Sequence, residues 1–127
     1  VTFKTEQTSV ADYAFYGCSE LTSVGSLDNV TEIGARAFQN CAALTSVGSI
    51  ANVESIGTYA FAGCTSIESL TITGKTTFID AYAFQKWTAN QTITFTEFTA
   101  APSTWKSTWK SSCSAKLVWA TAEESGE

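Results

Sequence analysis

The sequence predicts an α/β solenoid, a stack of similar coils around one shared core, closed by a C-terminal cap. Two observations support this fold class. A phrase of nine residues recurs as VADYAFYGC, IGARAFQNC, IGTYAFAGC and IDAYAFQKW. Its phenylalanines stand 23 residues apart, at Phe15, Phe38, Phe61 and Phe84. A fixed period of this length is typical of repeat architectures.

Other positions share the same register as the phenylalanines. One coil is too small to bury its own apolar side chains, but stacked coils turn each repeated position into a continuous ladder. The repeat therefore predicts the core, with columns at Ala14, Ala37, Ala60 and Ala83, at Val10, Ile33, Ile56 and Ile79, at Leu21, Leu44 and Ile67, and at Val24, Val47, Leu70 and Ile93.

One unit shows the expected order of elements within a coil. Residues 44–50 (LTSVGSI) alternate β-branched and small polar residues and predict a strand. Ala51-Asn52 predicts a turn, and residues 53–57 predict a second extended run. Residues 58–64 (TYAFAGC) end in Gly-Cys and predict one short helical turn.

The consensus L-x-x-V-x-x-[LI]-x-x-V-x-x-I-G-x-x-A-F-x-x-C occurs twice between Leu21 and Cys64. Residues 10–18 and 67–84 follow it less fully. In these motifs the chain resembles the BspA-like leucine-rich repeats, 23-residue repeats of bacterial cell-surface proteins, over residues 8–95. The resemblance implies a short right-handed leucine-rich-repeat coil stack, with parallel strands on the concave side and short helical turns.

The sequence departs from the family pattern at two places, and each departure predicts a local change in structure. Gly-Ser-Leu and Gly-Ser-Ile, ending at Leu27 and Ile50, replace the usual aliphatic residue followed by proline. We therefore expect an irregular concave strand in those two coils. Thr76 takes the place of Val30 and Val53, which favours a local shift of register there.

The repeat decays after Phe84. Residues 92–98 predict the last regular repeat strand by their alternation. Pro102 begins a predicted short helix on which Trp105 and Trp109 share one face and cap the stack, rather than bind carbohydrate. We expect repeats over residues 1–98 (about four units, the first truncated), a cap over 99–120 and a flexible tail over 121–127. Val1 aligns with the middle of a coil, so we expect a piece of a longer protein.

Composition argues against several functions. The 127 residues contain no histidine and carry a formal net charge of −5. Histidine-dependent triads are therefore impossible, and no phosphate-binding or dinucleotide motif occurs. The basic residues form no patch for nucleic acid, and no apolar stretch approaches the roughly 20 residues of a membrane span. We expect no enzyme, no cofactor and no metal.

Three of the four cysteines share one repeat position, which ends in Trp87. Their place beside a phenylalanine suits buried free thiols better than disulfides, although stacked coils bring neighbouring thiols close. Zinc is disfavoured because C-x2-C spacing and histidine are absent. We expect free thiols at the repeated position, and the redox state of Cys18, Cys41, Cys64 and Cys113 is left to experiment.

Two outward-facing columns are candidates for binding a partner. Arg36 is expected between two tyrosines of its column in cation–π contact, and tyrosine and arginine are favoured at interfaces. Each column also has a plain structural reading, as a soluble strand face or a shield over the core. The candidate residues are Tyr13, Arg36, Tyr59 and Tyr82 in one column and Thr22, Thr45, Glu68 and Gln91 in the other.

The resemblance implies a secreted or cell-surface bacterial protein that works in adhesion. We expect a non-catalytic protein-binding module, a monomer, whose partner is a host extracellular-matrix protein or another cell surface, with a glycan as the alternative ligand. The competing hypothesis is a structural spacer that displays another part of a larger surface protein.

Overall fold

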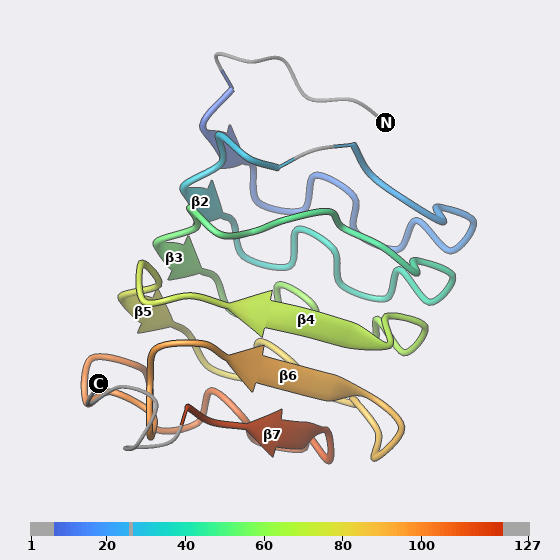
Figure 1. Ribbon diagram of the computed structural model, residues 1–127. Helices are drawn as coiled ribbons and strands as arrows, with labels where there is room; N and C mark the ends of the chain where they lie inside the picture. The colour runs from blue at the N-terminus through green and yellow to red at the C-terminus, as the bar shows by residue number, and fades with distance from the viewer. Residues whose placement is uncertain (1–6, 26, 121–127) are drawn as a thin grey trace.

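The computed structural model describes residues 7–25 and 27–120, which form a parallel-strand β-solenoid of about five turns (Figure 1). The strands of the stack form two parallel sheets. The first has the order β1-β2-β3-β5 and the second the order β4-β6-β7. Their strands are β1 (Ser9–Val10), β2 (Glu32–Ile33), β3 (Ser55–Ile56), β4 (Ser69–Ile72), β5 (Phe78–Ile79), β6 (Thr92–Phe95) and β7 (Lys116–Val118).

The strand register reproduces the period of the sequence. Ile33 pairs with Ile56 across β2 and β3, and Ile56 pairs with Ile79 across β3 and β5. The repeated phenylalanines stack face to face, with ring centroids 5.3, 5.4 and 5.8 Å apart along the column. The predicted coil stack is therefore confirmed, because the isoleucines and phenylalanines lie on their counterparts in the next coil. Of the predicted alanine column, Ala37, Ala60 and Ala83 are buried, but Ala14 in the first coil is exposed.

The predicted short helical turns are wrong, since the described residues contain no helix. In the third coil the backbone is left-handed at Tyr59 (φ 57°) and Gly63 (φ 76°). The amides of Tyr59, Phe61 and Gly63 donate to carbonyl oxygens of the next coil at 3.2, 2.8 and 2.8 Å. An α-helix directs its hydrogen bonds along its own axis, so these segments are successive tight turns tied to a neighbour.

The concave strand is irregular in the two coils where irregularity is expected. The segments before β4 share one isolated bridge, between Ser23 and Ser46, and form no named strand. Gly48 adopts a positive φ of 66° in the middle of the second segment. An extended strand cannot continue through that conformation, which explains why regular pairing on this side begins only at β4.

The predicted shift of register at Thr76 is wrong. Phe78 pairs with Ser55 and Ile79 with Ile56, so the step between coils is unchanged. Thr76 is fully buried, and its hydroxyl donates to the backbone oxygen of Val53 at 2.7 Å. Threonine replaces valine here without a shift because its one polar atom finds a partner in the coil above.

The last coil is covered by tryptophans. Trp105 and Trp109 are buried and pack against the Phe95 ring, on which Trp119 stacks at 4.0 Å. Their residues form turns instead of the predicted helix, and Lys106 donates its amide to Ile79 at 2.9 Å. The predicted final strand at residues 116–119 corresponds to β7.

The domain limits at residues 98 and 120 stay predictions. The expectation about Val1 and the flexible tail over 121–127 lie outside the described residues. In the part of the chain that the structure describes, no helix has the length and apolarity that crossing a bilayer requires.

Candidate functional site

The tyrosine–arginine column is built on strained backbone. Non-glycine residues rarely adopt positive φ, yet all four positions of the column do so. The same backbone conformation therefore recurs at this position in every coil of the column. The φ values are 62° at Tyr13, 60° at Arg36, 57° at Tyr59 and 59° at Tyr82.

Contacts within the column follow the prediction in part. The guanidinium carbon of Arg36 lies 4.3 Å from the centre of the Tyr59 ring, and Tyr59 stacks on Tyr82 at 5.2 Å. Arg36 also donates to the side-chain oxygen of Gln39 at 2.9 Å. Tyr13, expected on the other side of Arg36, instead packs edge to face against Tyr16 at 5.5 Å.

Tyr13 and Tyr16 are the most exposed large hydrophobic side chains of the described residues, at 56% and 48% of their area. Tyr16 was not among the predicted residues. A signal for it exists in the sequence, because the same repeat position holds Gln39, Ala62 and Gln85 in the later coils. An aromatic residue that breaks the repeat at an exposed position is a candidate contact residue.

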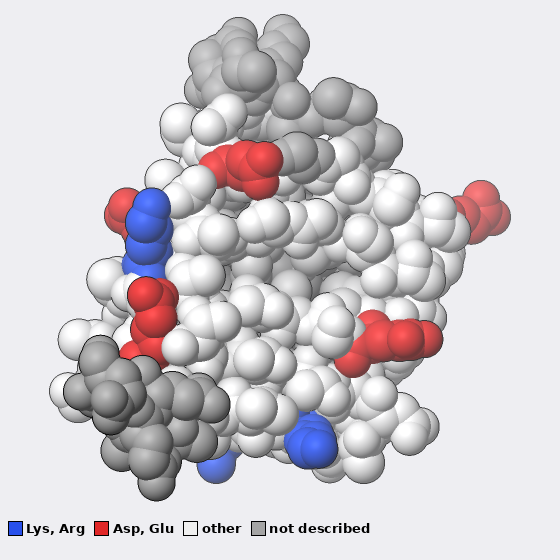
Figure 2. Space-filling model, in the orientation of Figure 1, with Lys and Arg blue, Asp and Glu red and all other residues white. Residues whose placement is uncertain are grey.

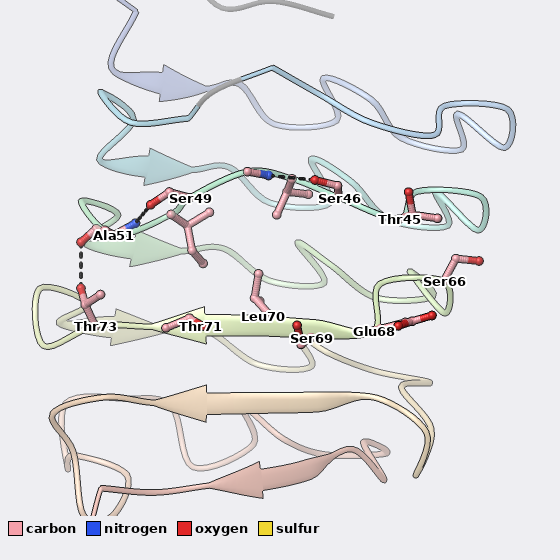
Figure 3. A pocket seen from close by; sticks show the side chains of 13 residues that line it. Thr45, Ser46, Ser49, Ala51, Ser66, Glu68, Ser69, Leu70, Thr71 and Thr73 are labelled. Atoms are coloured by element: carbon pink, nitrogen blue, oxygen red, sulfur yellow. Dashed lines mark hydrogen bonds between the residues drawn. The ribbon is translucent and has the colours of Figure 1, made fainter.

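A groove opens on the second-sheet side, where β4 faces the irregular segment above it (Figure 3). Its volume is ≈ 660 Å³. No backbone–backbone hydrogen bond joins residues 44–51 to residues 66–73. Two side-chain bonds of 2.7 Å close the groove at its ends, from Ser66 to the Ala42 oxygen and from Thr73 to the Ala51 oxygen. The missing strand pairing therefore creates the groove.

Two of the predicted residues, Thr45 and Glu68, line this groove, together with six further serines and threonines and with apolar side chains that include Val47, Ile50 and Leu70. Glu68 is its one charged lining residue. Thr22 is exposed one coil above, where its carbonyl accepts the Thr45 hydroxyl at 3.0 Å. The face seen in Figure 2 is likewise mostly uncharged. The groove suits hydrogen bonding and apolar contact more than ionic contact.

The expectation that Gln91 faces outward is wrong. Gln91 is 2% exposed, and its side-chain nitrogen donates to the carbonyl oxygens of Cys64 and Ile67, both at 2.8 Å. The residue that precedes this position is inward-facing Leu44 or Ile67 in the two earlier coils. In the coil of Gln91 the corresponding residue is Asn90, which is exposed. The amide of Gln91 turns inward because buried carbonyls need a donor.

A second groove of ≈ 650 Å³ lies over turns between the two sheets and was not predicted. Lys75 donates to the Asn52 side chain at 2.7 Å, and Asn52 donates to the Asp28 carbonyl at 2.6 Å. These polar groups are used to join neighbouring coils. We therefore assign this groove to the structure of the stack.

The repeated cysteine position is a hydrogen-bonded ladder. The thiol of Cys41 donates to the Phe15 carbonyl at 3.1 Å, and the thiol of Cys64 donates to the Phe38 carbonyl at 3.0 Å. Trp87 continues the ladder with its ring N–H, 2.8 Å from the Phe61 carbonyl. The interpretation as simple apolar filling is therefore incomplete, because each member satisfies a buried carbonyl.

The four thiols are free in this structure, with Cys41 and Cys64 buried and Cys18 and Cys113 half-buried. Contact with the Cys64 thiol holds the pKa of Cys41 below its ordinary value, against the effect of burial. The same contact, with burial, raises the pKa of Cys64. Among the described residues no cluster of three or more acidic, cysteine or histidine residues could hold a metal ion.

Comparison with known proteins points to one family. The sequence model described as the BspA type leucine rich repeat region matches residues 1–106 in 6 copies. No curated protein and no solved structure shows a match to this sequence.

Proposed function

Because the chain belongs to the family of BspA-type leucine-rich repeats, we propose that it is a non-catalytic adhesion module that binds a protein partner through its repeat surface. Proteins with these repeats are typically secreted or displayed on the bacterial surface. Leucine-rich repeats commonly mediate protein interactions and are generally not enzymes. The proposal places this chain on the surface or outside the cell.

The observation that carries the proposal is the exposed aromatic pair at the start of the tyrosine–arginine column. Tyr13 and Tyr16 present their rings to solvent, and Arg36 lies on Tyr59 in the same column. Tyrosine and arginine are enriched among residues that dominate binding energy. Ring stacking and the fixed backbone hold the lower column in place, which reduces the entropy lost on binding.

The polar groove beside β4 supports a second contact area on another face of the coil. Its hydroxyls and free backbone groups can exchange water for hydrogen bonds to a partner, although such contacts add little energy without an aromatic anchor. The proposal therefore assigns affinity to the tyrosines and treats Thr45 and Glu68 as polar contacts.

The test compares two variants for binding to immobilised matrix proteins, cell-surface proteins and glycans. Tyr13→Ser/Tyr16→Ser removes the exposed pair with little cost to the core, and Val118→Ser removes an exposed apolar side chain, 37% exposed, in β7. We expect the double variant to weaken protein binding by about tenfold or more, since a central tyrosine contributes roughly 2 kcal/mol. Val118→Ser should bind like the wild type.

Equal affinity of both variants would remove the tyrosine column from the interface. If the wild-type protein binds none of the proteins, the spacer hypothesis replaces the adhesion module. Binding to glycans alone would identify the ligand class that the sequence leaves as the alternative. Circular dichroism of each variant establishes that the fold is intact.

A further inference from the structure

The cysteine ladder places thiols of neighbouring coils in register. Around Cys18 the two coils are locked together, since Phe15 donates its amide to Ala37 at 2.7 Å and Gly17 donates to Gln39 at 2.8 Å. Parallel chains held in this way lie roughly 4.8 Å apart, within the Cα separation of about 4.4–6.8 Å that disulfides span. Cys18 and Cys41 therefore meet the backbone requirement for a disulfide.

Burial separates the members of the ladder. Cys18 is half-buried, whereas Cys41 and Cys64 have no exposed area. Tyr16, Gly17 and Ser19 are exposed around Cys18. A disulfide needs the β-carbons closer than stacking alone brings them, about 3.5–4.5 Å. The exposed turn can make that shift without displacing buried atoms.

The thiol that would close the protein disulfide is the next one inward, Cys41. Contact with the Cys64 thiol lowers the pKa of Cys41, burial opposes this effect, and the Cys18 backbone adds to the lowering. Thiolate is the attacking species in disulfide exchange. Cys64 has its pKa raised by the same contact and by burial, and so keeps its proton. These differences favour thiol–disulfide exchange at Cys18 and Cys41, the pair nearest solvent.

We propose that Cys18 and Cys41 form a reversible disulfide on reaction with a small-molecule disulfide such as oxidised glutathione, and that Cys64 stays a thiol behind them. The Cys18 thiolate attacks the reagent, forms a mixed disulfide and releases one small thiol. The Cys41 thiolate then attacks the Cys18 sulfur and releases the second small thiol. Two protons leave the protein thiols, and two electrons pass to the reagent.

The disulfide would join the coil of Cys18 covalently to the coil of Cys41. It would form where disulfides persist, outside the cell, and would be lost in a reducing compartment. This inference concerns chemistry of the ladder and does not depend on protein binding by the tyrosine column.

The test incubates the folded protein in glutathione buffers of increasing oxidised fraction, followed by alkylation in acid and peptide mapping by mass spectrometry. We expect a peptide that links Cys18 to Cys41, with a loss of two hydrogens, and Cys64 alkylated only after unfolding. The linked protein should melt at a higher temperature than the reduced one. Dithiothreitol should reverse both changes.

Two variants control the assignment. Cys64→Ser keeps a donor for the Phe38 carbonyl and should still form the link, whereas Cys18→Ser should leave Cys41 and Cys64 unlinked. A link mapped to Cys41 and Cys64, a stable glutathione adduct on Cys18 without a link, or free thiols at every buffer ratio would each overturn the proposal. Mapping of the wild-type protein decides the question even if a variant fails to fold.

Discussion

The phenylalanine column allows a quantitative test of how the stack is stabilised. Phe61 is fully buried and lies between Phe38 at 5.4 Å and Phe84 at 5.8 Å. Phe15 occupies the same repeat position, stacks on Phe38 at 5.3 Å and is half-buried. Phe61→Ala and Phe15→Ala therefore make the same chemical change at two depths of one ladder.

The expected costs follow from burial and stacking. Removing a fully buried phenylalanine costs about 3–5 kcal/mol, and each aromatic pair contributes about 0.5–1.5 kcal/mol beyond its buried area. With a ring on each side, Phe61→Ala belongs near the upper end, about 4–5 kcal/mol. A half-buried ring exposes much of its area already, so we expect about 2 kcal/mol for Phe15→Ala.

The assay is equilibrium unfolding in urea, followed by the fluorescence of Trp87, Trp105 and Trp109, which are buried near the C-terminal end. A chain of 127 residues has a total stability of roughly 6–19 kcal/mol at about 0.05–0.15 kcal/mol per residue. Both variants should therefore fold, with the lower midpoint for Phe61→Ala. Equal losses of stability at the two positions would refute the account of a ladder stabilised by neighbours on both sides.

Two further predictions concern buried polar groups. Gln91→Leu should lower the free energy of unfolding by about 2–5 kcal/mol, because the carbonyls of Cys64 and Ile67 lose their donor. Asn90→Leu, at the exposed neighbour, should change it by less than about 0.5 kcal/mol; similar urea midpoints for the two variants would contradict the assignment. Burial raises the pKa of Cys113 above its ordinary value of 9.0. The folded protein then keeps a proton that the unfolded chain loses, so the Cys113 contribution is complete below about pH 9 and is lost as the pH rises through the folded pKa. Cys113→Ser should flatten this decline in unfolding curves measured from pH 8 upward, and an unchanged slope would count against it.

The turns that carry the repeated phrase show where prediction from sequence stops. The spacing of Ala60, Phe61 and Cys64 fits one turn of helix, which is the structure that the local pattern predicts. Hydrogen bonds three residues back occur in 3₁₀ helices and in tight turns alike. The choice depends on the carbonyls of Ala81 and Ala83, which receive the amides of Tyr59 and Phe61 from a coil 23 residues later.

The candidate site was predicted in part for a similar reason. Tyr13, Arg36, Tyr59 and Tyr82 were found because they share a register. Tyr16 shares its repeat position with Gln39, Ala62 and Gln85, so it was missed by a search for positions that hold the same type of residue in every coil. The groove beside β4 arises from hydrogen bonds that residues 44–51 do not make, and a missing pairing leaves no positive pattern in the sequence.

The 23-residue periodicity was sufficient to predict the repeat length, most of the inward columns and the order of the coils, because each coil must offer its neighbour the same apolar surface. The tertiary structure alone decided the direction of polar side chains and amides. Gln91 faces inward and Thr76 keeps its register because each finds a buried carbonyl in another coil. Such a carbonyl comes within reach of the side chain only when the coils stack. The hydrogen bond formed there then outweighs the orientation that the local sequence pattern favours.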